Sequence, residues 1–248
     1  MGNTEHNYSD WNIDESDACD NNTTYSEYVK RCTEELNAIY KKAEQGDAEA
    51  QYRLGSCYYN GDGVNEDKAG AVKWYRKAAK QGDAEAQYQL GWCYYYGNGV
   101  SRDEATAEKW WRQAAEQYRQ AAEQGYAIGQ RFLGVCYDRG EGVKKDYAEA
   151  VKWYRKAAAQ GDVCGQLHLG DCYYGGAGVH KNYKKAVKWY RKAAEQGNAK
   201  AQCKLGWCYY YGEGVYKDKA EAIKWYRQAA EQGDSMAEWK LKMLQKRA

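Results

Sequence analysis

The residues with the clearest potential for chemistry are cysteines and histidines, of which the chain has 9 and 3. Cys164, His168 and Cys172 are spaced four residues apart, so a helix would place them on one face. Such a face could hold metal ligands, and Cys164 with His168 could act as a nucleophile and its base. The sequence offers no second ligand pair with metal spacing and no Ser-x-x-Lys motif. We therefore predict that the chain is not an enzyme and has no catalytic residue, cofactor site or metal site.

Five of the cysteines share one position of a repeated pattern, three residues after a leucine. They are Cys57, Cys93, Cys136, Cys172 and Cys208. A free cysteine packs as a small apolar side chain, and a recurring position of this kind suits a core. We expect these thiols to lie in the core rather than in disulfides.

The elements that must position these residues are set by a repeat, which glycines in the run Gln-Gly-Asp, Gln-Gly-Asn or Gln-Gly-Tyr mark along the chain. Their separations are 36, 43, 36, 36 and 36 residues, for Gly46, Gly82, Gly125, Gly161, Gly197 and Gly233. A fixed period of this size indicates stacked supersecondary units.

Each repeat reads as helix, loop, helix. Gly82 can adopt the left-handed conformation that ends a helix, and Asp83 can cap the next helix by accepting from exposed amides. The second helices also have Asp or Asn at their caps, at Asp67, Asp103, Asp146, Asn182 and Asp218. A tryptophan recurs in every second helix, as at Trp74 and Trp153, and we expect it to pack between repeats because all copies share that task.

The full pattern resembles the Sel-one-like repeat (SLR), a relative of the tetratricopeptide repeat. It reads Leu54-Gly55-x-x-Tyr58, Gly61-x-Gly63-Val64-x-x-Asp67 and Ala71-x-x-Trp74-Tyr75-x-x-Ala78-Ala79-x-x-Gly82. It recurs five times in full and covers residues 46–240. The resemblance implies an all-α fold, a right-handed α/α superhelix (solenoid) of tandem two-helix repeats, with five full copies plus partial terminal helices. In this family the first helices line a concave groove that adaptor proteins use for binding.

The resemblance also carries alternatives. A cysteine-rich, secreted subgroup pairs a cysteine at the end of one second helix with one in the following first helix, but here Ala and Gln occupy the former positions. Hydrolase activity is attributed to some of those relatives. We therefore keep two further hypotheses beside a scaffold or adaptor: a weak hydrolase (beta-lactamase-like) or thiol-dependent enzyme, and a self-associating structural module.

Three first-helix positions face the groove by analogy with tetratricopeptide geometry, and they differ among the copies. The central one reads Ser56, Trp92, Val135, Asp171 and Trp207; its flanks read Tyr52, Tyr88, Arg131, Leu167, Cys203 and Asn60, Tyr96, Arg139, Gly175, Tyr211. Variation confined to one face indicates a binding surface, although drift of an unpacked face explains it as well. The hypothesis is that Trp92 and Trp207 anchor a peptide in two apolar pockets, because Trp and Tyr are favoured as interface anchors.

Specificity would come from charges in the middle of the array. The predicted partner-binding residues are Tyr52, Tyr88, Trp92, Tyr96, Arg131, Asp138, Arg139, His168, Asp171, Trp207 and Tyr211. The expected partner is a protein or peptide.

The net charge of +2, from 37 basic and 35 acidic groups, gives no field that would track phosphates, so nucleic acid is not an expected partner. Residues 1–25 are rich in Asn, Asp and Ser and are predicted to be a disordered lead, followed by the repeat array over residues 26–248. The start lacks the pattern of a signal peptide, and no stretch has the apolar length of a membrane span. From these features we expect a cytoplasmic protein that does not enter the membrane.

One interval is longer because residues 111–117 are followed by a near copy in residues 118–124. Seven residues are about two helical turns, so an insertion of this length keeps the buried stripe nearly in phase. We predict a single helix over residues 103–124, longer than its counterparts.

Overall fold

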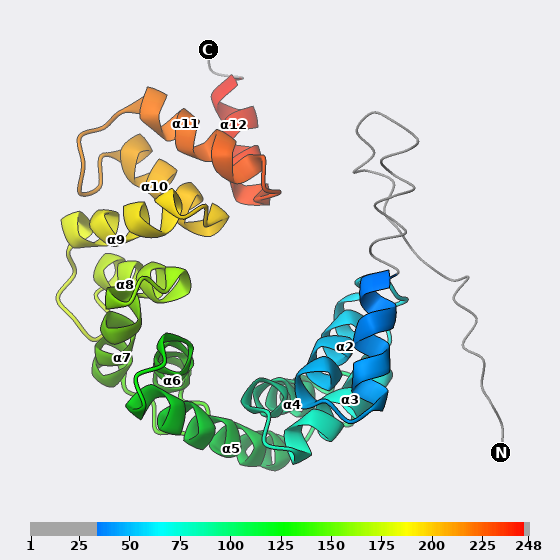
Figure 1. Cartoon of the computed structure of the whole chain (residues 1–248). Helices are drawn as coiled ribbons and strands as arrows, with labels where there is room; N and C mark the ends of the chain where they lie inside the picture. The colour runs from blue at the N-terminus through cyan, green and yellow to red at the C-terminus, as the bar shows by residue number, and fades with distance from the viewer. Residues whose placement is uncertain (1–33, 246–248) are drawn as a thin grey trace, which may run out of the picture. The chain divides into compact units, whose positions relative to one another are not determined.

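The computed structural model describes residues 34–245, and in that range every regular element is an α-helix (Figure 1). After a helix over residues 34–44, they are α2 (Ala48–Asn60), α3 (Lys68–Lys80), α4 (Ala84–Tyr96), α5 (Glu104–Glu123), α6 (Ala127–Arg139), α7 (Tyr147–Ala159), α8 (Val163–Gly175), α9 (Tyr183–Glu195), α10 (Ala199–Tyr211), α11 (Lys219–Ala230) and α12 (Ser235–Gln245). The predicted class, an all-α array of tandem helix pairs, is confirmed. The predicted lead over residues 1–25 lies outside the described residues, and so does the start of the array predicted from residue 26.

The helices group into two compact units, and the boundary between them falls within α5, between Gln117 and Tyr118. In unit 1 the first helices are α2 and α4, with α3 and the first part of α5 as second helices. In unit 2 the first helices are α6, α8, α10 and α12, and α7, α9 and α11 are second helices. The first helices α2, α6, α8 and α10 each pack on the second helix that follows.

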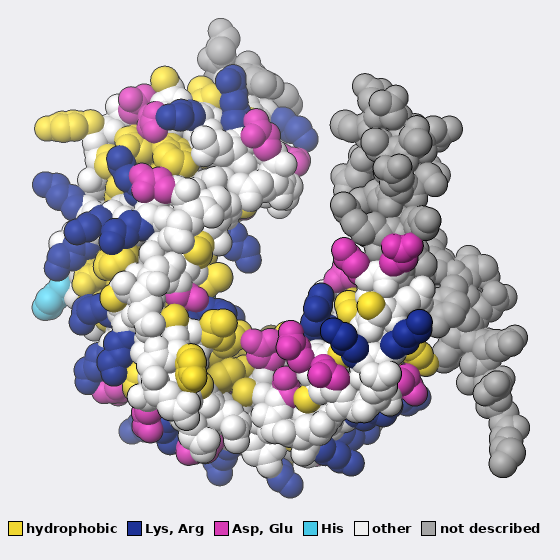
Figure 2. Space-filling model, viewed as in Figure 1, with side chains coloured by type: hydrophobic (Ala, Val, Ile, Leu, Met, Phe, Trp, Pro, Cys, Tyr) yellow, Lys and Arg dark blue, Asp and Glu magenta, His cyan; other side chains and the backbone are white. Residues whose placement is uncertain are grey.

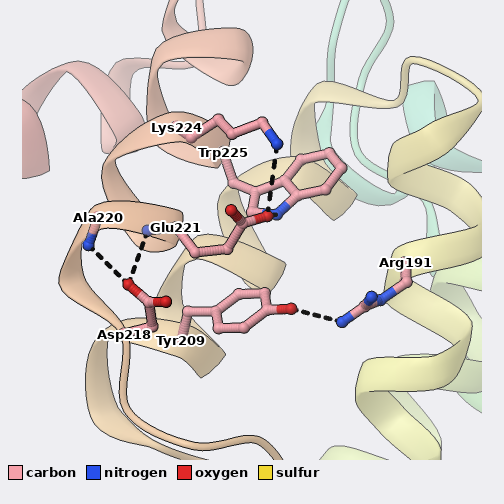
Figure 3. Close-up of polar contacts among 7 residues, drawn as sticks. All are labelled: Arg191, Tyr209, Asp218, Ala220, Glu221, Lys224 and Trp225. Atoms are coloured by element: carbon pink, nitrogen blue, oxygen red, sulfur yellow. Dashed lines mark hydrogen bonds and ion pairs between the residues drawn. The ribbon is translucent and has the colours of Figure 1, made fainter.

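The predicted caps form because they need only residues within one helical turn. Asp83 accepts a hydrogen bond from the Ala86 amide at 2.7 Å and starts α4, directly after Gly82 with its φ of 92°. The cap of α11 is drawn in Figure 3, where Asp218 accepts from the amides of Ala220 and Glu221 at 2.9 and 3.0 Å. The caps at Asp67, Asp103, Asp146 and Asn182 form in the same way.

In four repeats the largest fully buried side chain is the tyrosine after the repeated tryptophan, and in the repeat of α4 and α5 Trp111 takes that place. Tyr75, Tyr154, Tyr190 and Tyr226 are fully buried, and each ring lies against a glycine of the preceding first helix. A Cβ at Gly55, for example, would come within 2.7 Å of the Tyr75 ring. The glycine therefore makes the notch that lets the two helices of one repeat approach closely.

The repeated tryptophans correct the prediction in part. Trp74 does pack between repeats, against Leu36 and Ala43 of the preceding helix and with its ring 6.2 Å from that of Tyr40. It faces the preceding repeat rather than the next one. These rings are only half-buried, and lysines of their own helices cover them, with Lys77 Nζ 3.7 Å from the Trp74 ring centroid and Lys156 Nζ 4.0 Å from that of Trp153. The tyrosine, not the tryptophan, fills the core.

Buried glutamines join consecutive repeats. Gln51 donates to the Ala43 carbonyl at 3.0 Å, and Gln87 donates to the Ala79 carbonyl at 3.1 Å. The side-chain oxygens of Gln51, Gln130, Gln166 and Gln202 accept from the glutamine that ends the second helix of the same repeat, as Gln51 does from Gln81 at 2.8 Å. Gln87 is the exception, because its side-chain oxygen has no hydrogen-bond partner among the described residues. In the other repeats this pairing satisfies polar groups that would otherwise be costly to bury.

The predicted long helix is confirmed, since α5 continues over 20 residues while α3, α7 and α9 have 13. Its two halves carry out separately the two tasks that one ordinary second helix combines. Trp111 fills the notch at Gly91 of α4 in unit 1, whereas Ala122 accepts from Gln130 of α6 in unit 2 at 3.3 Å. The duplication therefore supplied one copy of the packing pattern to each unit.

Candidate partner-binding surface

The surface that the first helices leave uncovered runs through four positions at helical spacing, which we call the first-helix face. On α4 these are Glu85, Gln89, Trp92 and Tyr96, and on α10 they are Lys200, Lys204, Trp207 and Tyr211. All eight side chains are at least partly exposed. Side chains at i, i+4, i+7 and i+11 lie on one side of a helix, so each row presents a continuous stripe to solvent.

In unit 1 this face is centred on Trp92, which is half-buried. Its ring stacks on Tyr96 with centroids 5.2 Å apart, and it makes edge contacts with Tyr88, Tyr95 and Trp111 at 6.4, 6.0 and 5.4 Å. Tyr96 is 61% exposed, and Tyr88 is buried. The predicted residues Tyr88, Trp92 and Tyr96 therefore form one aromatic cluster, while Tyr52 lies one repeat earlier against Tyr75 at 5.9 Å.

In unit 2 the corresponding residue, Trp207, is also half-buried, and its ring lies 4.5 Å from that of Tyr211. The cation of Lys240, from the next first helix α12, lies 4.2 Å from the Trp207 ring centroid and 5.3 Å from that of Tyr211. Lys240 Nζ also donates to the Tyr211 hydroxyl at 3.3 Å. Rings of Tyr210 and Trp239 complete the surroundings of this buried lysine.

The charged residues predicted to set specificity all lie in unit 2, and they pair chiefly within the protein. Asp171 accepts from the Tyr190 hydroxyl at 2.7 Å and pairs with Lys204 at 3.1 Å. Arg131 pairs with Asp162 at 3.4 Å, and Arg139 pairs with the largely buried Glu141 at 3.9 Å.

His168 and Asp138 both meet the buried ring of Tyr154. His168 stacks on this ring at 4.9 Å, and Asp138 accepts from its hydroxyl at 3.5 Å. Burial lowers the pKa of His168 below its usual value, against the opposing effect of Asp171 and Asp138. Trp92 belongs to unit 1 and Trp207 to unit 2.

Two features of the face were missed at the sequence level. The first is a variable position at the start of each first helix, which reads Glu49, Glu85, Ile128, Cys164, Lys200 and Met236. It is acidic in unit 1 and apolar or basic in unit 2. Its variation among the copies was the available signal, the same one that singled out the positions of Trp92 and Tyr96.

The second is a contact rule between consecutive repeats. Lys204 of α10 pairs with Asp171 of α8, in the preceding repeat. Lys240 occupies the same position of α12, and its cation lies over the ring of Trp207 of α10. Figure 2 shows hydrophobic side chains reaching the surface over α10 and α11 with Lys and Arg side chains around them.

Two members of the alternative catalytic grouping, His168 and Cys172, are held by packing. Cys164, His168 and Cys172 do lie on one helix, α8, but His168 is held against Tyr154 and Cys172 is buried. Burial raises the pKa of the Cys172 thiol to about 12, which keeps it protonated at neutral pH and a poor nucleophile. Cys93, Cys136 and Cys208 are buried at the same repeat position with their pKa values raised to about 11, 12 and 12, and Cys57 is half-buried.

Over residues 34–245, no helix is both long enough and apolar enough to span a membrane. The same part of the chain contains no group of three His, Cys, Asp or Glu side chains arranged to hold a metal ion.

Comparison with known proteins agrees with the repeat pattern. The family profile for the Sel1 repeat matches residues 48–83, 84–117, 118–126, 127–162, 165–198 and 199–234, with its break at the duplicated segment of α5. No curated protein matches the chain.

Several solved structures share the fold. A Sel1 repeat protein from Oxalobacter formigenes is 35% identical, covering 90% of this chain and 87% of its own, with a TM-score of 0.61. A protective antigen with an SLR fold, from uropathogenic Escherichia coli strains, is 41% identical over 84% of this chain, with a TM-score of 0.50. The present chain spans only 43% of that antigen's length. An immunity protein from Pseudomonas aeruginosa is 25% identical over 77% of this chain and 67% of its own, with a TM-score of 0.53.

Proposed function

We propose that this chain, which belongs to the Sel1 repeat family, holds a protein or peptide partner against the first-helix face of each unit, with Trp92 as the anchor in unit 1 and Trp207 as the anchor in unit 2. Sel1 repeats are generally protein–protein interaction modules, and the family's scaffold is typically non-catalytic. Beyond this general property of the family, we propose which face binds, which residues anchor the partner, and that the protein acts as a scaffold or adaptor.

The observation that carries the proposal is a buried polar atom of the second helix, beside each of the two tryptophans, that has no hydrogen-bond partner among the described residues. Where the central face position holds Ser56 or Asp171, that residue accepts from the buried tyrosine of its repeat, Tyr75 at 3.3 Å or Tyr190 at 2.7 Å. Where it holds Trp92 or Trp207, the buried Trp111 Nε1 and Tyr226 hydroxyl have no hydrogen-bond partner among the described residues.

An unsatisfied buried donor costs about 1–3 kcal/mol. Hydrogen bonding within the fold would favour a small polar residue at positions 92 and 207, so ring packing accounts for only part of the presence of the two tryptophans. Half-exposed Trp and Tyr side chains are favoured as anchors of protein interfaces. Tyr96 and Tyr211, 61% and 47% exposed beside them, extend both apolar surfaces.

The test is capture of partners from native lysate on the immobilised full chain, followed by calorimetric titration with each captured protein. Tyr96→Ala and Tyr211→Ala should each weaken binding by about 2 kcal/mol. The thermal midpoint should not change for Tyr96→Ala, because Tyr96 is 61% exposed, whereas Tyr211→Ala also removes the hydroxyl that accepts from Lys240. Trp92→Ala and Trp207→Ala should weaken it at least as much.

Tyr216→Ala is the matched control, since Tyr216 is 97% exposed but lies in the loop after α10, off the face. Partners that bind all four face variants as tightly as they bind the wild type and the Tyr216→Ala control would show that the face is not the binding surface.

A further inference from the structure

A pocket of about 420 Å³ opens beside Trp207 within unit 2, a volume in the range of sites that hold small ligands or single side chains. Tyr174, Tyr190, Trp207 and Met236 form much of its wall, and Lys200 and Lys204 add two ammonium groups. The Trp207 ring lies 4.5 Å from that of Tyr211, and the cation of Lys240 lies 4.2 Å from its centroid. The wall is therefore apolar and braced on both sides of the indole.

The carboxylates around this pocket are already engaged. Asp171 binds the Tyr190 hydroxyl and Lys204, and Glu213 accepts from the Tyr174 hydroxyl at 2.7 Å. Asp234 accepts from the Ala237 amide at 2.8 Å at the start of α12.

The lysines are less engaged than the acids. Lys200 is exposed and makes no ion pair among the described residues. The side chain of Lys204 remains 44% exposed beside Asp171. Both lie on α10 four residues apart, so their ammonium groups reach the same side of the helix. The positive charge of the two lysines is therefore not fully paired within the protein, and a ligand with one negative charge would complement it.

We propose that this pocket binds an apolar side chain that is next to a carboxylate on a peptide partner. The apolar group would lie against Trp207 and Met236, and the carboxylate would pair with Lys200 and Lys204. A dianionic phosphate fits less well, because the pocket has no arginine fork among its lining residues and Lys binds as a point charge. This inference rests on the proposed function and specifies the chemistry that unit 2 would select.

The carboxylate can come from the end of a chain or from an acidic side chain, and four fluorescein-labelled probes distinguish the two sources. One is Gly-Ser-Gly-Phe with a free C-terminus, and the second is the same peptide as its C-terminal amide. The third is Gly-Ser-Glu-Phe-Gly amide, and the fourth replaces its Glu by Gln. Binding to the full chain is followed by fluorescence anisotropy at low salt, where exposed charges are least screened.

At least one carboxylate probe should bind tenfold or more tightly than its neutral counterpart. Lys200→Glu and Trp207→Ala should each remove most of that difference. Lys188→Glu is the matched control because Lys188 is an exposed lysine on α9 that does not line the pocket. Melting curves of the exposed-site variants Lys200→Glu and Lys188→Glu should match the wild type.

Equal binding of acid and neutral probes, no binding of any probe up to millimolar concentration, or equal losses in the Lys188→Glu and Lys200→Glu proteins would each overturn the pocket assignment. Its failure is separable from that of the proposed function. If captured partners need Tyr211 and Trp207 but tolerate Lys200→Glu, the face binds and the pocket chemistry is wrong. If the probes bind as expected but no captured partner depends on the face, the pocket stands and the scaffold role fails.

Discussion

Trp92 and Trp207 occupy the same position of two repeats, one in each unit, yet their surroundings differ. The ring of Trp92 is enclosed by other rings, with Trp111 of the second helix at 5.4 Å and Tyr96 stacked at 5.2 Å. Trp207 has Tyr211 on one side and the buried cation of Lys240 from the next repeat close to its ring. The same residue at the same repeat position is thus part of an aromatic core in one unit and of a cation-bearing site in the other.

The difference extends to the neighbouring positions. Glu49 and Glu85 start the first helices of unit 1, whereas Lys200 and Met236 occupy that place at the end of unit 2. A repeat framework keeps the backbone positions equal while each unit varies the chemistry that it presents. The two faces are therefore expected to prefer different partner segments.

The largest expected effect concerns the glycine notches under the two tryptophans. A Cβ at Gly91 would overlap the indole of Trp111, a deeper clash than the 2.9 Å approach to Tyr226 that a Cβ at Gly206 would make. Gly91→Ala should destabilise the protein by about 2–3 kcal/mol, and Gly206→Ala by no more than about 1 kcal/mol, because helix propensity offsets the milder clash. Urea denaturation checks both. Equal losses would mean that Trp111 and Tyr226 fill equivalent notches.

The second-largest effect should be a difference in stability between variants of the two tryptophans. Trp92→Ala should cost about 2–3 kcal/mol, since it removes packing on Trp111, and Trp207→Ala about 1 kcal/mol less. Trp207→Ser should be less destabilising than Trp207→Ala, because a serine there would give the Tyr226 hydroxyl the acceptor that Ser56 gives Tyr75. A denaturation midpoint for Trp207→Ser at or below that for Trp207→Ala would remove the unsatisfied hydroxyl as an explanation.

A substitution at Lys240 tests whether the charge or the aliphatic part of this lysine stabilises unit 2. Lys240→Met keeps an unbranched apolar stem and should lose about 1 kcal/mol of unfolding free energy, the value of a cation held over aromatic rings. Lys242→Met is the control, because Lys242 is 75% exposed and its contact with Glu238 spans 4.0 Å. A gain in stability for Lys240→Met would show that desolvation of the ammonium outweighs its attraction to the rings.

The smallest effect should be a pH dependence confined to unit 2. His168 stacks on Tyr154, and burial lowers its pKa in the folded state below the value of about 6.5 expected when unfolded. The unfolded chain then binds a proton first, so the stability contributed by neutral His168 is complete above that pH and declines as pH falls below it. The nearby groups are Asp171 and Asp138, which oppose the shift, and Arg131 and Arg139, which add to it.

His168→Phe copies Phe132, the residue at this position one repeat earlier, which stacks on Tyr118 at 4.7 Å. Denaturation at pH 7.5 and pH 5.5 should show a smaller difference for His168→Phe than for the wild type. An unchanged difference would assign the pH dependence to the acidic groups instead.

Much of the fold follows from local sequence alone. The caps at Asp67 and Asp218, the left-handed glycines between helices and the continuous α5 were predictable because each depends on residues within a few positions along the chain. The position of the candidate face followed as well, since side chains at helical spacing share one side of a helix whatever surrounds it. The half-exposed state expected of Trp92 and Trp207 is present.

The tertiary structure decided what those side chains meet. The sequence pattern predicted that Trp74 packs between repeats, but the ring that fills the notch at Gly55 is that of Tyr75, because the packing of two helices selects one ring by its direction. The pairing of Asp171 with Lys204 and of Trp207 with Lys240 joins residues from consecutive repeats. Such contacts depend on how one repeat is set against the next, and helical periodicity specifies the face of a helix but not the neighbour that the face will touch.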